Sequence, residues 1–295
     1  MAARTVIGGV FVAILFLGLL YAAFAPLLQP IRLPRVQMPW FTGGTGIIEQ
    51  YGLVKGTNVS DSVRFVDLNV TVKFGAMFVV FSNKPDLALQ ASFEHGANAP
   101  ELETNYTFDG NSSLQVSMHG ESGSLNLTLG RGYRYDGELG LRFGAVFMEL
   151  GQYSDVGKLA VEIRYAGGVS LNVTSGASFE QLDLSMDIGG LLMNINADNL
   201  GRNGAINTNI TMGGVMTSVG IDTTQVGVSF EAEVDTGGLT VDQVYFEGPV
   251  SGTHCSVKTH GYASAARKLD VKANIGAGGG SIQQSMGFGF PGFST

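Results

Sequence analysis

The sequence has little cysteine, little charge and no excess of basic residues. A single cysteine, Cys255, occurs in 295 residues, which excludes an internal disulfide. Charged residues make up 14% of the chain, and the net charge is −8. Nucleic-acid binding depends on a basic patch, and the sequence contains none. We therefore expect no nucleic-acid partner.

Motifs for catalysis are also missing. The sequence contains no Gly-x-Ser-x-Gly motif, no phosphate-binding loop and no His-Glu-x-x-His motif. His254, Cys255 and His260 form the only cluster of histidine and cysteine, and a metal site would need a fourth ligand. We expect one partly buried strand residue and two solvated histidines. The sequence predicts no enzyme, with no catalytic, cofactor-binding or metal-binding residues.

Aspartates near the glycine-rich turns raise the alternative of a calcium site. They are Asp183, Asp187, Asp198, Asp222, Asp235 and Asp242. None of them lies in the Gly-Gly-x-Gly-x-Asp pattern of calcium-binding β-rolls. We expect most of them on polar strand faces, and calcium stays a minor alternative to no cofactor at all.

Glycine, by contrast, is abundant, with 43 residues, and it recurs at a fixed period. Four Gly-Gly pairs lie 22, 24 and 24 residues apart, at Gly167-Gly168, Gly189-Gly190, Gly213-Gly214 and Gly237-Gly238. Single glycines that precede alternating runs extend the series to Gly75, Gly123, Gly144 and Gly280, whereas Gly157 is out of step. A fixed period of this size is typical of stacked β repeats, because each unit leaves an apolar face for its neighbour to cover.

The runs between the glycines alternate apolar and polar residues, as strands with one buried face do. In residues 230–235, Phe230, Ala232 and Val234 should face inward, while the acidic residues between them face water. Two short strands per repeat are expected. The predicted fold is all-β, a β-solenoid or toastrack-like stack of short strands. An antiparallel β-meander is the alternative, with residues 235–238 as a hairpin turn.

The N-terminus carries an apolar segment of 20 residues without a charge, Val6 to Ala25. At about 1.5 Å per residue it matches a hydrocarbon core roughly 30 Å thick. We predict a transmembrane signal-anchor helix over residues 1–28, with the lipid bilayer as partner through residues 6–25. A signal peptide cleaved after Ala25 is the alternative, although Pro26 would then follow the cut.

Three further segments complete the predicted organisation. Four of the eight prolines lie within residues 26–39, which favours an extended stalk over residues 29–57. A repetitive β ectodomain follows over residues 58–285. Glycine and phenylalanine then dominate a flexible tail at residues 286–295.

Seven asparagine sequons indicate that the β domain is exported. The candidate glycosylation sites are Asn58, Asn69, Asn105, Asn111, Asn126, Asn172 and Asn209. The alternative is that polar strand faces place asparagine beside threonine without modification. If the sequons are used, Asn172 and Asn209 must point to solvent. We expect a single-pass protein of the cell membrane with its C-terminal domain outside.

Two of the glycine runs resemble a known family. Asp187-Ile-Gly-Gly-Leu191 and Asp235-Thr-Gly-Gly-Leu239 resemble the putative adhesin or "toastrack" family of domains of unknown function, over about residues 120 to 285. The resemblance implies stacked short strands, often tethered to a membrane helix. It rests on glycine and alternation, so no functional residues carry over from it.

The expected function is adhesion or envelope scaffolding at the cell surface, through contacts with cell-envelope glycans or surface proteins. A pilin-like filament subunit is one alternative, with the apolar N-terminal segment packed in a fibre. A carbohydrate-binding or carbohydrate-acting β-helix protein is another, and catalysis would need acids clustered across adjacent coils. The ladder of Asp187, Thr211 and Asp235 is broken by a threonine.

Overall fold

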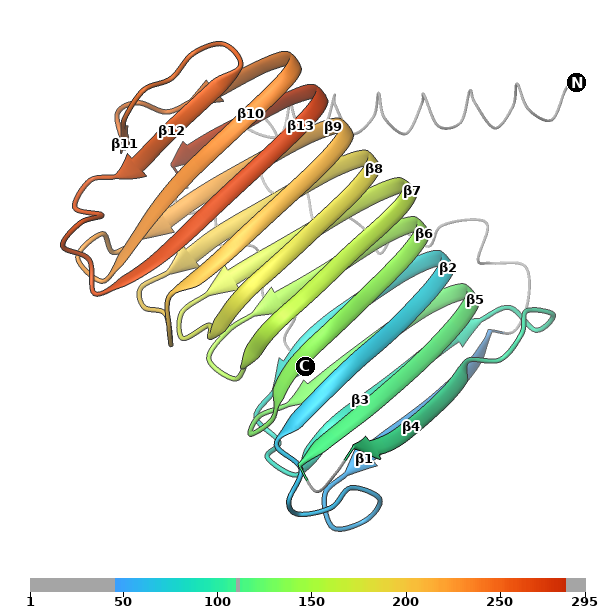
Figure 1. Ribbon diagram of the computed structural model, residues 1–295. Coiled ribbons are helices and arrows are strands. Elements are labelled where there is room, and N and C mark those ends of the chain that lie inside the picture. The colour runs from blue at the N-terminus through green and yellow to red at the C-terminus, as the bar shows by residue number, and fades with distance from the viewer. Residues whose placement is uncertain (1–45, 110–111, 285–295) are drawn as a thin grey trace, which may run out of the picture. The chain divides into compact units, whose positions relative to one another are not determined.

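The computed structural model describes residues 46–109 and 112–284, and all regular structure in this part of the chain is β-strand. Thirteen strands join in one hydrogen-bonded sheet (Figure 1). The all-β class is therefore confirmed. Within the described ranges no helix is long and apolar enough to cross a bilayer. The expected span at residues 6–25, most of the expected stalk and the tail at 286–295 lie outside these ranges.

Eight long strands of 16 to 19 residues form the body of the domain. They are β2 (Phe65–Ser82), β5 (Ser113–Gly130), β6 (Arg134–Leu150), β7 (Val156–Thr174), β8 (Phe179–Ala197), β9 (Gly204–Ile221), β10 (Val226–Val241) and β13 (Arg267–Gln284). All pair in parallel, as the coils of a solenoid do. The antiparallel meander is therefore wrong for these strands.

Each long strand bends near its middle, so the sheet folds back into two layers (Figure 1). The bend lies at one edge of the stack, the corner edge, and the connections between strands lie at the opposite turn edge. The expectation of two short strands per repeat is thus corrected. One strand runs through residues 235–238 without a hairpin, because the chain turns the corner without leaving the hydrogen-bonded ladder.

The corner is built from a column of eight glycines. In spatial order they are Gly123, Gly75, Gly144, Gly167, Gly189, Gly213, Gly278 and Gly237. At every position except Gly123, a Cβ would lie 1.6–1.9 Å from the carbonyl oxygen of the neighbouring glycine. Only glycine allows strands to bend this tightly in register. The last corner glycine is Gly278; Gly280, expected from the sequence, pairs with Val215 and Leu239 instead.

The spatial order of the strands differs from the chain order at both ends. β5 lies outside β2, and β13 inserts between β9 and β10. Antiparallel strands then complete the ends: β4 (Glu103–Asp109), β3 (Leu87–His95) and β1 (Ile47–Val54) beyond β5, and β12 (His254–Thr259) and β11 (Phe246–Glu247) beyond β10. β1 falls within the expected stalk of residues 29–57, so the β domain starts before residue 58.

The core lies between the two layers and follows the predicted alternation. Phe230, Ala232 and Val234 are buried, and the acidic residues between them are exposed. Tyr135 is fully buried, and its hydroxyl lies 2.7 Å from the carbonyl oxygen of Ala88 and 2.8 Å from that of Gly130. Burial raises the pKa of this hydroxyl, so it stays protonated and bridges two strands.

Candidate interaction surfaces

The histidine and cysteine cluster of the sequence does not converge in space. Cys255 is buried, and burial raises the pKa of its thiol, whereas His254 and His260 are exposed. Across residues 46–109 and 112–284, no three His, Cys, Asp or Glu side chains are grouped to hold a metal ion. Asp183 lies on β8 and accepts a hydrogen bond from Asn207 on β9 at 2.8 Å. Asp222 lies in the turn after β9 and accepts a hydrogen bond from Thr224, which lowers the pKa of that carboxyl.

The sequon asparagines lie mainly on the outer faces of the two layers. Asn69, Asn105, Asn126 and Asn209 are exposed. Asn172 is half-buried and accepts a hydrogen bond from Asn194 at 3.0 Å. The Asn58 amide donates to the carbonyl of Gly52 at 2.8 Å, so its nitrogen is engaged in a turn. Asn111 lies outside the described residues, and glycosylation of the others stays a prediction.

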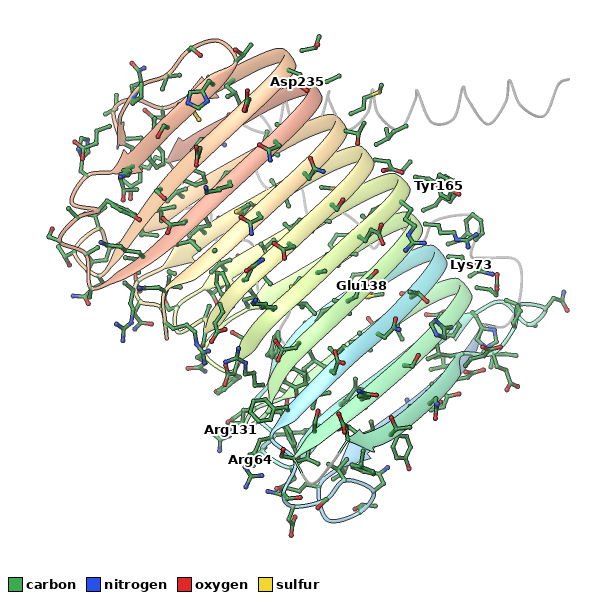
Figure 2. The ribbon with its side chains drawn as sticks, in the orientation of Figure 1. Arg64, Lys73, Arg131, Glu138, Tyr165 and Asp235 are labelled. Atoms are coloured by element: carbon green, nitrogen blue, oxygen red, sulfur yellow. The ribbon has the colours of Figure 1, made fainter. Side chains whose placement is uncertain are left out.

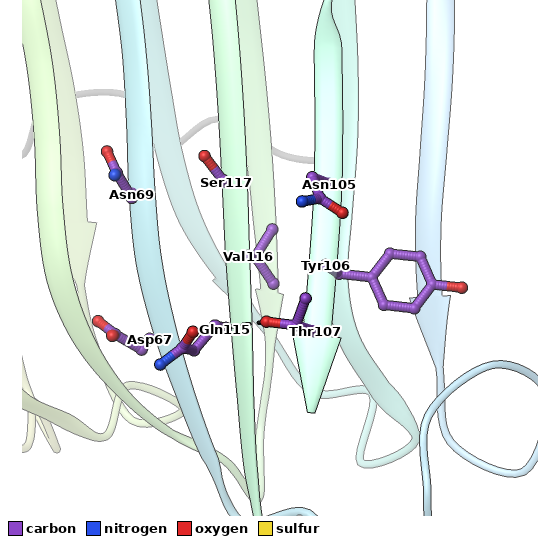
Figure 3. Close-up of a pocket in the computed structure, with 8 residues that line it drawn as sticks. All are labelled: Asp67, Asn69, Asn105, Tyr106, Thr107, Gln115, Val116 and Ser117. Atoms are coloured by element: carbon purple, nitrogen blue, oxygen red, sulfur yellow. Dashed lines mark hydrogen bonds between the residues drawn. The ribbon is translucent and has the colours of Figure 1, made fainter. Parts of the chain in front are cut away.

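A polar pocket of about 260 Å³ lies on the outer face of the sheet where β4, β5 and β2 meet (Figure 3). Its polar lining consists of Asp67, Asn69, Asn105, Thr107, Gln115 and Ser117. Thr107 donates a hydrogen bond to Gln115 at 3.4 Å. Tyr106 points away from these side chains (Figure 3). The pocket therefore offers amide, hydroxyl and carboxylate groups on a rigid strand ladder.

A row of apolar side chains follows the corner edge, one residue ahead of the glycine column on four strands and two residues ahead of it on β7, where a register shift occurs. We call this row the corner ridge; it consists of Phe74, Phe143, Tyr165, Ile188 and Met212, on β2, β6, β7, β8 and β9. All except the half-buried Phe143 are exposed by 41–54%. The ring centroids of Phe74 and Phe143 are 5.4 Å apart, and those of Phe143 and Tyr165 are 5.0 Å apart. Both pairs are stacked face to face.

A cation precedes each aromatic residue of the corner ridge. Lys73, Arg142 and Arg164 stand directly before the three rings in the chain. Lys73 pairs with Glu121, and Arg164 Nε lies 3.0 Å from Glu162 Oε2. Lys73 and Tyr165 project from the corner edge (Figure 2). The ridge therefore combines apolar and cationic groups on three adjacent strands.

An ion-pair network crosses the turn edge. Arg134 on β6 binds Glu180 on β8 through two hydrogen bonds of 2.8 and 2.7 Å, and Arg202 binds both Glu180 and Asp155. The guanidinium of Arg134 lies over Gly157 of β7, where a Cβ would meet Arg134 Nε at 2.6 Å. A Cβ there would also lie close to Asp136 Oδ1, so Gly157, which is out of step with the corner glycines, leaves room for both side chains. Arg134 lowers the pKa of Glu180 through these hydrogen bonds.

A second sequence pattern marks the corner ridge: a cationic residue followed by an aromatic residue, shortly before a corner glycine. Lys73-Phe74-Gly75 and Arg142-Phe143-Gly144 repeat one pattern, and Arg164-Tyr165 varies it, with Ala166 between the ring and Gly167. The pocket had no such signal, because β4 and β2 are separated along the chain and both pair with β5.

Known proteins resemble this chain in fold but not in sequence. No model of a known protein family matches this chain, and no curated protein matches it in sequence. The chain is similar to the crystal structure of a putative cell adhesion protein from Clostridium sporogenes, with a TM-score of 0.55, 15% identity, and coverage of 82% of this chain and 100% of that one. A putative adhesin from Bacteroides fragilis gives a TM-score of 0.34, 11% identity, and coverage of 82% and 97%. The first similarity shows a shared fold; the second is too low to carry an argument.

Proposed function

We propose that this chain is a membrane-anchored cell-surface protein whose β domain lies outside the cell and mediates adhesion. The apolar segment at residues 6–25 supports an anchor, because its length suits a bilayer. Exposed asparagines in sequons support export. The fold is similar to that of the cell adhesion protein from Clostridium sporogenes, which makes adhesion the first function to test.

The polar pocket is the observation that carries a specific form of this proposal, adhesion through glycans. Sugar hydroxyls both donate and accept hydrogen bonds, and the lining side chains offer both functions. The proposal requires that Asn69 and Asn105, which line the pocket and lie in sequons, are unmodified here. Because these side chains stand on paired strands, their backbone is already ordered, and a ligand needs to order only the side chains. The ligand class is therefore a cell-envelope polysaccharide or a surface glycan.

Glycan binding can be tested with the full-length chain in detergent on an array of envelope polysaccharides and surface glycans. Asp67 and Gln115 line the pocket without belonging to a sequon, so Asp67→Ala with Gln115→Ala leaves glycosylation sites intact. Loss of two ligand hydrogen bonds should weaken binding about tenfold or more. Asn274→Ala is the matched control, because Asn274 is an exposed amide on β13 outside the pocket.

Equal binding by the pocket variant and the control would contradict the pocket as the glycan site. Surface biotinylation of intact cells tests exposure separately: lysines of the β domain, such as Lys268 and Lys272, should react without permeabilisation. Purification as a polymer with a trimmed N-terminus would instead favour the filament subunit.

A further inference from the structure

We propose that the corner ridge is a lipid-docking edge, by which the β domain rests on the surface of the bilayer that anchors it. The inference rests on the proposed membrane anchor. It adds an orientation: the corner edge faces the lipid, and the turn edge faces away from it.

The composition of the corner ridge suits a membrane interface. Aromatic rings together with Lys and Arg are enriched at the headgroup level, where apolar surface meets water and lipid phosphates. Lys73 and Arg164 flank their rings as ion-pair partners of Glu121 and Glu162, whereas Arg142 makes no ion pair within the described residues and can meet a lipid phosphate. Ile188 and Met212 continue the apolar row with 41% and 54% exposure.

The geometry of the rings argues against a sugar as the occupant. Sugars stack on free aromatic faces, but here the planes of Phe74 and Phe143 differ by 3° and those of Phe143 and Tyr165 by 15°. Phe143 therefore has both faces covered, and each outer ring keeps a single uncovered face, at the two ends of the stack. Lipid headgroups and the upper acyl region accept ring edges without a defined pocket.

The size of the ridge argues against a second copy as the occupant. Five side chains that are about half exposed offer several hundred Å² at most, comparable to a large patch on an ordinary monomer. A stable dimer buries about 1,200–2,000 Å² in total. A tethered domain needs much less contact, because the tether holds it at a high effective concentration near the membrane.

The chain ahead of the β domain has the length for such a tether. Residues 26–45 separate the apolar segment from the first described residue. In an extended, proline-rich form at about 3.1 Å per residue they would reach roughly 60 Å. The row from β2 to β9 covers four strand spacings of about 4.8 Å, so the tether is long enough for the whole ridge to meet the surface.

The outer faces of the two layers carry the candidate glycans, and the ridge does not. Of the sequon asparagines that the structure describes, none is part of the corner ridge. Glycans on the layers would keep those faces away from lipid. The corner edge is then free to approach the bilayer closely.

Site-specific lipid quenching tests the docking. Ser122 lies beside Phe74 at the corner and is exposed, so Ser122→Cys reports on the ridge without changing it. Arg131→Cys is the matched probe, because Arg131 projects from the turn edge (Figure 2). Cys255 is buried and should stay unlabelled. Each full-length variant is labelled with a fluorophore and reconstituted in phosphatidylcholine and phosphatidylglycerol vesicles with headgroup spin-labelled lipid.

Docking predicts severalfold stronger quenching at residue 122 than at residue 131. Combining Phe74→Ser, Tyr165→Ser and Met212→Ser should reduce the quenching at residue 122 to the level at residue 131. Equal quenching at both probes in the unaltered ridge would overturn the proposal. So would self-quenching between labels at residue 122 without lipid quenching, which would show that a second copy covers the ridge.

Alkaline carbonate extraction of the same vesicles separates this inference from its premise. A chain that stays in the membrane but shows no preferential quenching refutes only the docking edge. A chain that carbonate removes refutes the anchor, and the docking proposal with it.

Discussion

Replacing Gly189 by alanine should damage the stack far more than the same change at Gly190, the next residue. A Cβ at residue 189 would lie 1.9 Å from the carbonyl oxygen of Gly167, in β7. A Cβ at residue 190 would lie 3.6 Å from the nearest atom, the carbonyl oxygen of Gly214. Neither glycine has a φ in the left-handed region, so the comparison isolates the steric contact between strands.

The distances set the magnitude. Carbon and carbonyl oxygen approach to about 3.3 Å, so the Gly189→Ala variant must separate β7 and β8 by roughly 1.4 Å at the corner. A shift of that size breaks about two ladder hydrogen bonds and opens the core beneath them. We expect a loss of about 3–5 kcal/mol in the free energy of unfolding. Gly190→Ala should be neutral, or stabilising by about 0.4–1 kcal/mol through the lower entropy of the unfolded chain.

Urea denaturation followed by circular dichroism measures both changes, and hydrogen exchange locates them. Stacked repeats depend on nearest-neighbour interfaces, so Gly189→Ala should increase exchange mainly in β7 and β8. Equal stability of the two variants would refute the argument that the glycine column exists to bring the strands together. Increased exchange spread evenly over all strands would refute its locality.

Three further changes test the interior and the turn edge. Thr208 Oγ1 is buried without a hydrogen-bond partner among the described residues, so Thr208→Val should raise the free energy of unfolding in urea by about 1 kcal/mol; a loss would contradict this. Tyr135→Phe should lower it by about 1–3 kcal/mol, because two carbonyl groups lose the buried hydroxyl; unchanged stability would argue against that bridge. Arg134 lowers the pKa of Glu180, so the unfolded chain takes up this proton more readily. The pairing therefore stabilises the fold above the unfolded pKa of about 4.3, and this stability is lost as pH falls through the lower folded value. Glu180→Gln should flatten acid unfolding curves in that range, and curves parallel to those of the unaltered protein would refute this prediction.

Glycine spacing and alternation were enough to predict the corner and the two faces of each strand. The column includes the first glycine of each predicted pair, because strands that bend tightly in register leave no space for a Cβ. These glycines are Gly167, Gly189, Gly213 and Gly237. Spacing could not show that one strand passes through each bend, since a bend and a strand end both favour glycine.

The strand order and the surfaces needed the structure. Gly213 and Gly237 are one period apart along the chain, yet Gly278 lies between them. Such an insertion leaves no trace in local spacing, because β13 has the same pattern as its neighbours. The pocket depends on which strand pairs with β5, and the corner ridge depends on which strands are adjacent. Both surfaces therefore follow from long-range pairing that local sequence patterns do not encode.

Because β13 inserts between β9 and β10, the sheet cannot be completed in the order in which the strands are synthesised. β13 pairs with β9 on one side and with β10 on the other, and it is the last strand that the structure describes. In the folded sheet β9 and β10 do not pair directly. When a nascent chain has been translated as far as β10, these two strands therefore lack their shared partner, which is supplied only by residues 267–284. Premature termination before residue 267 would leave two unpaired strand edges, which are open to aggregation and proteolysis. The sheet of the domain is therefore continuous only after β13 has been translated, late among the strands that the structure describes.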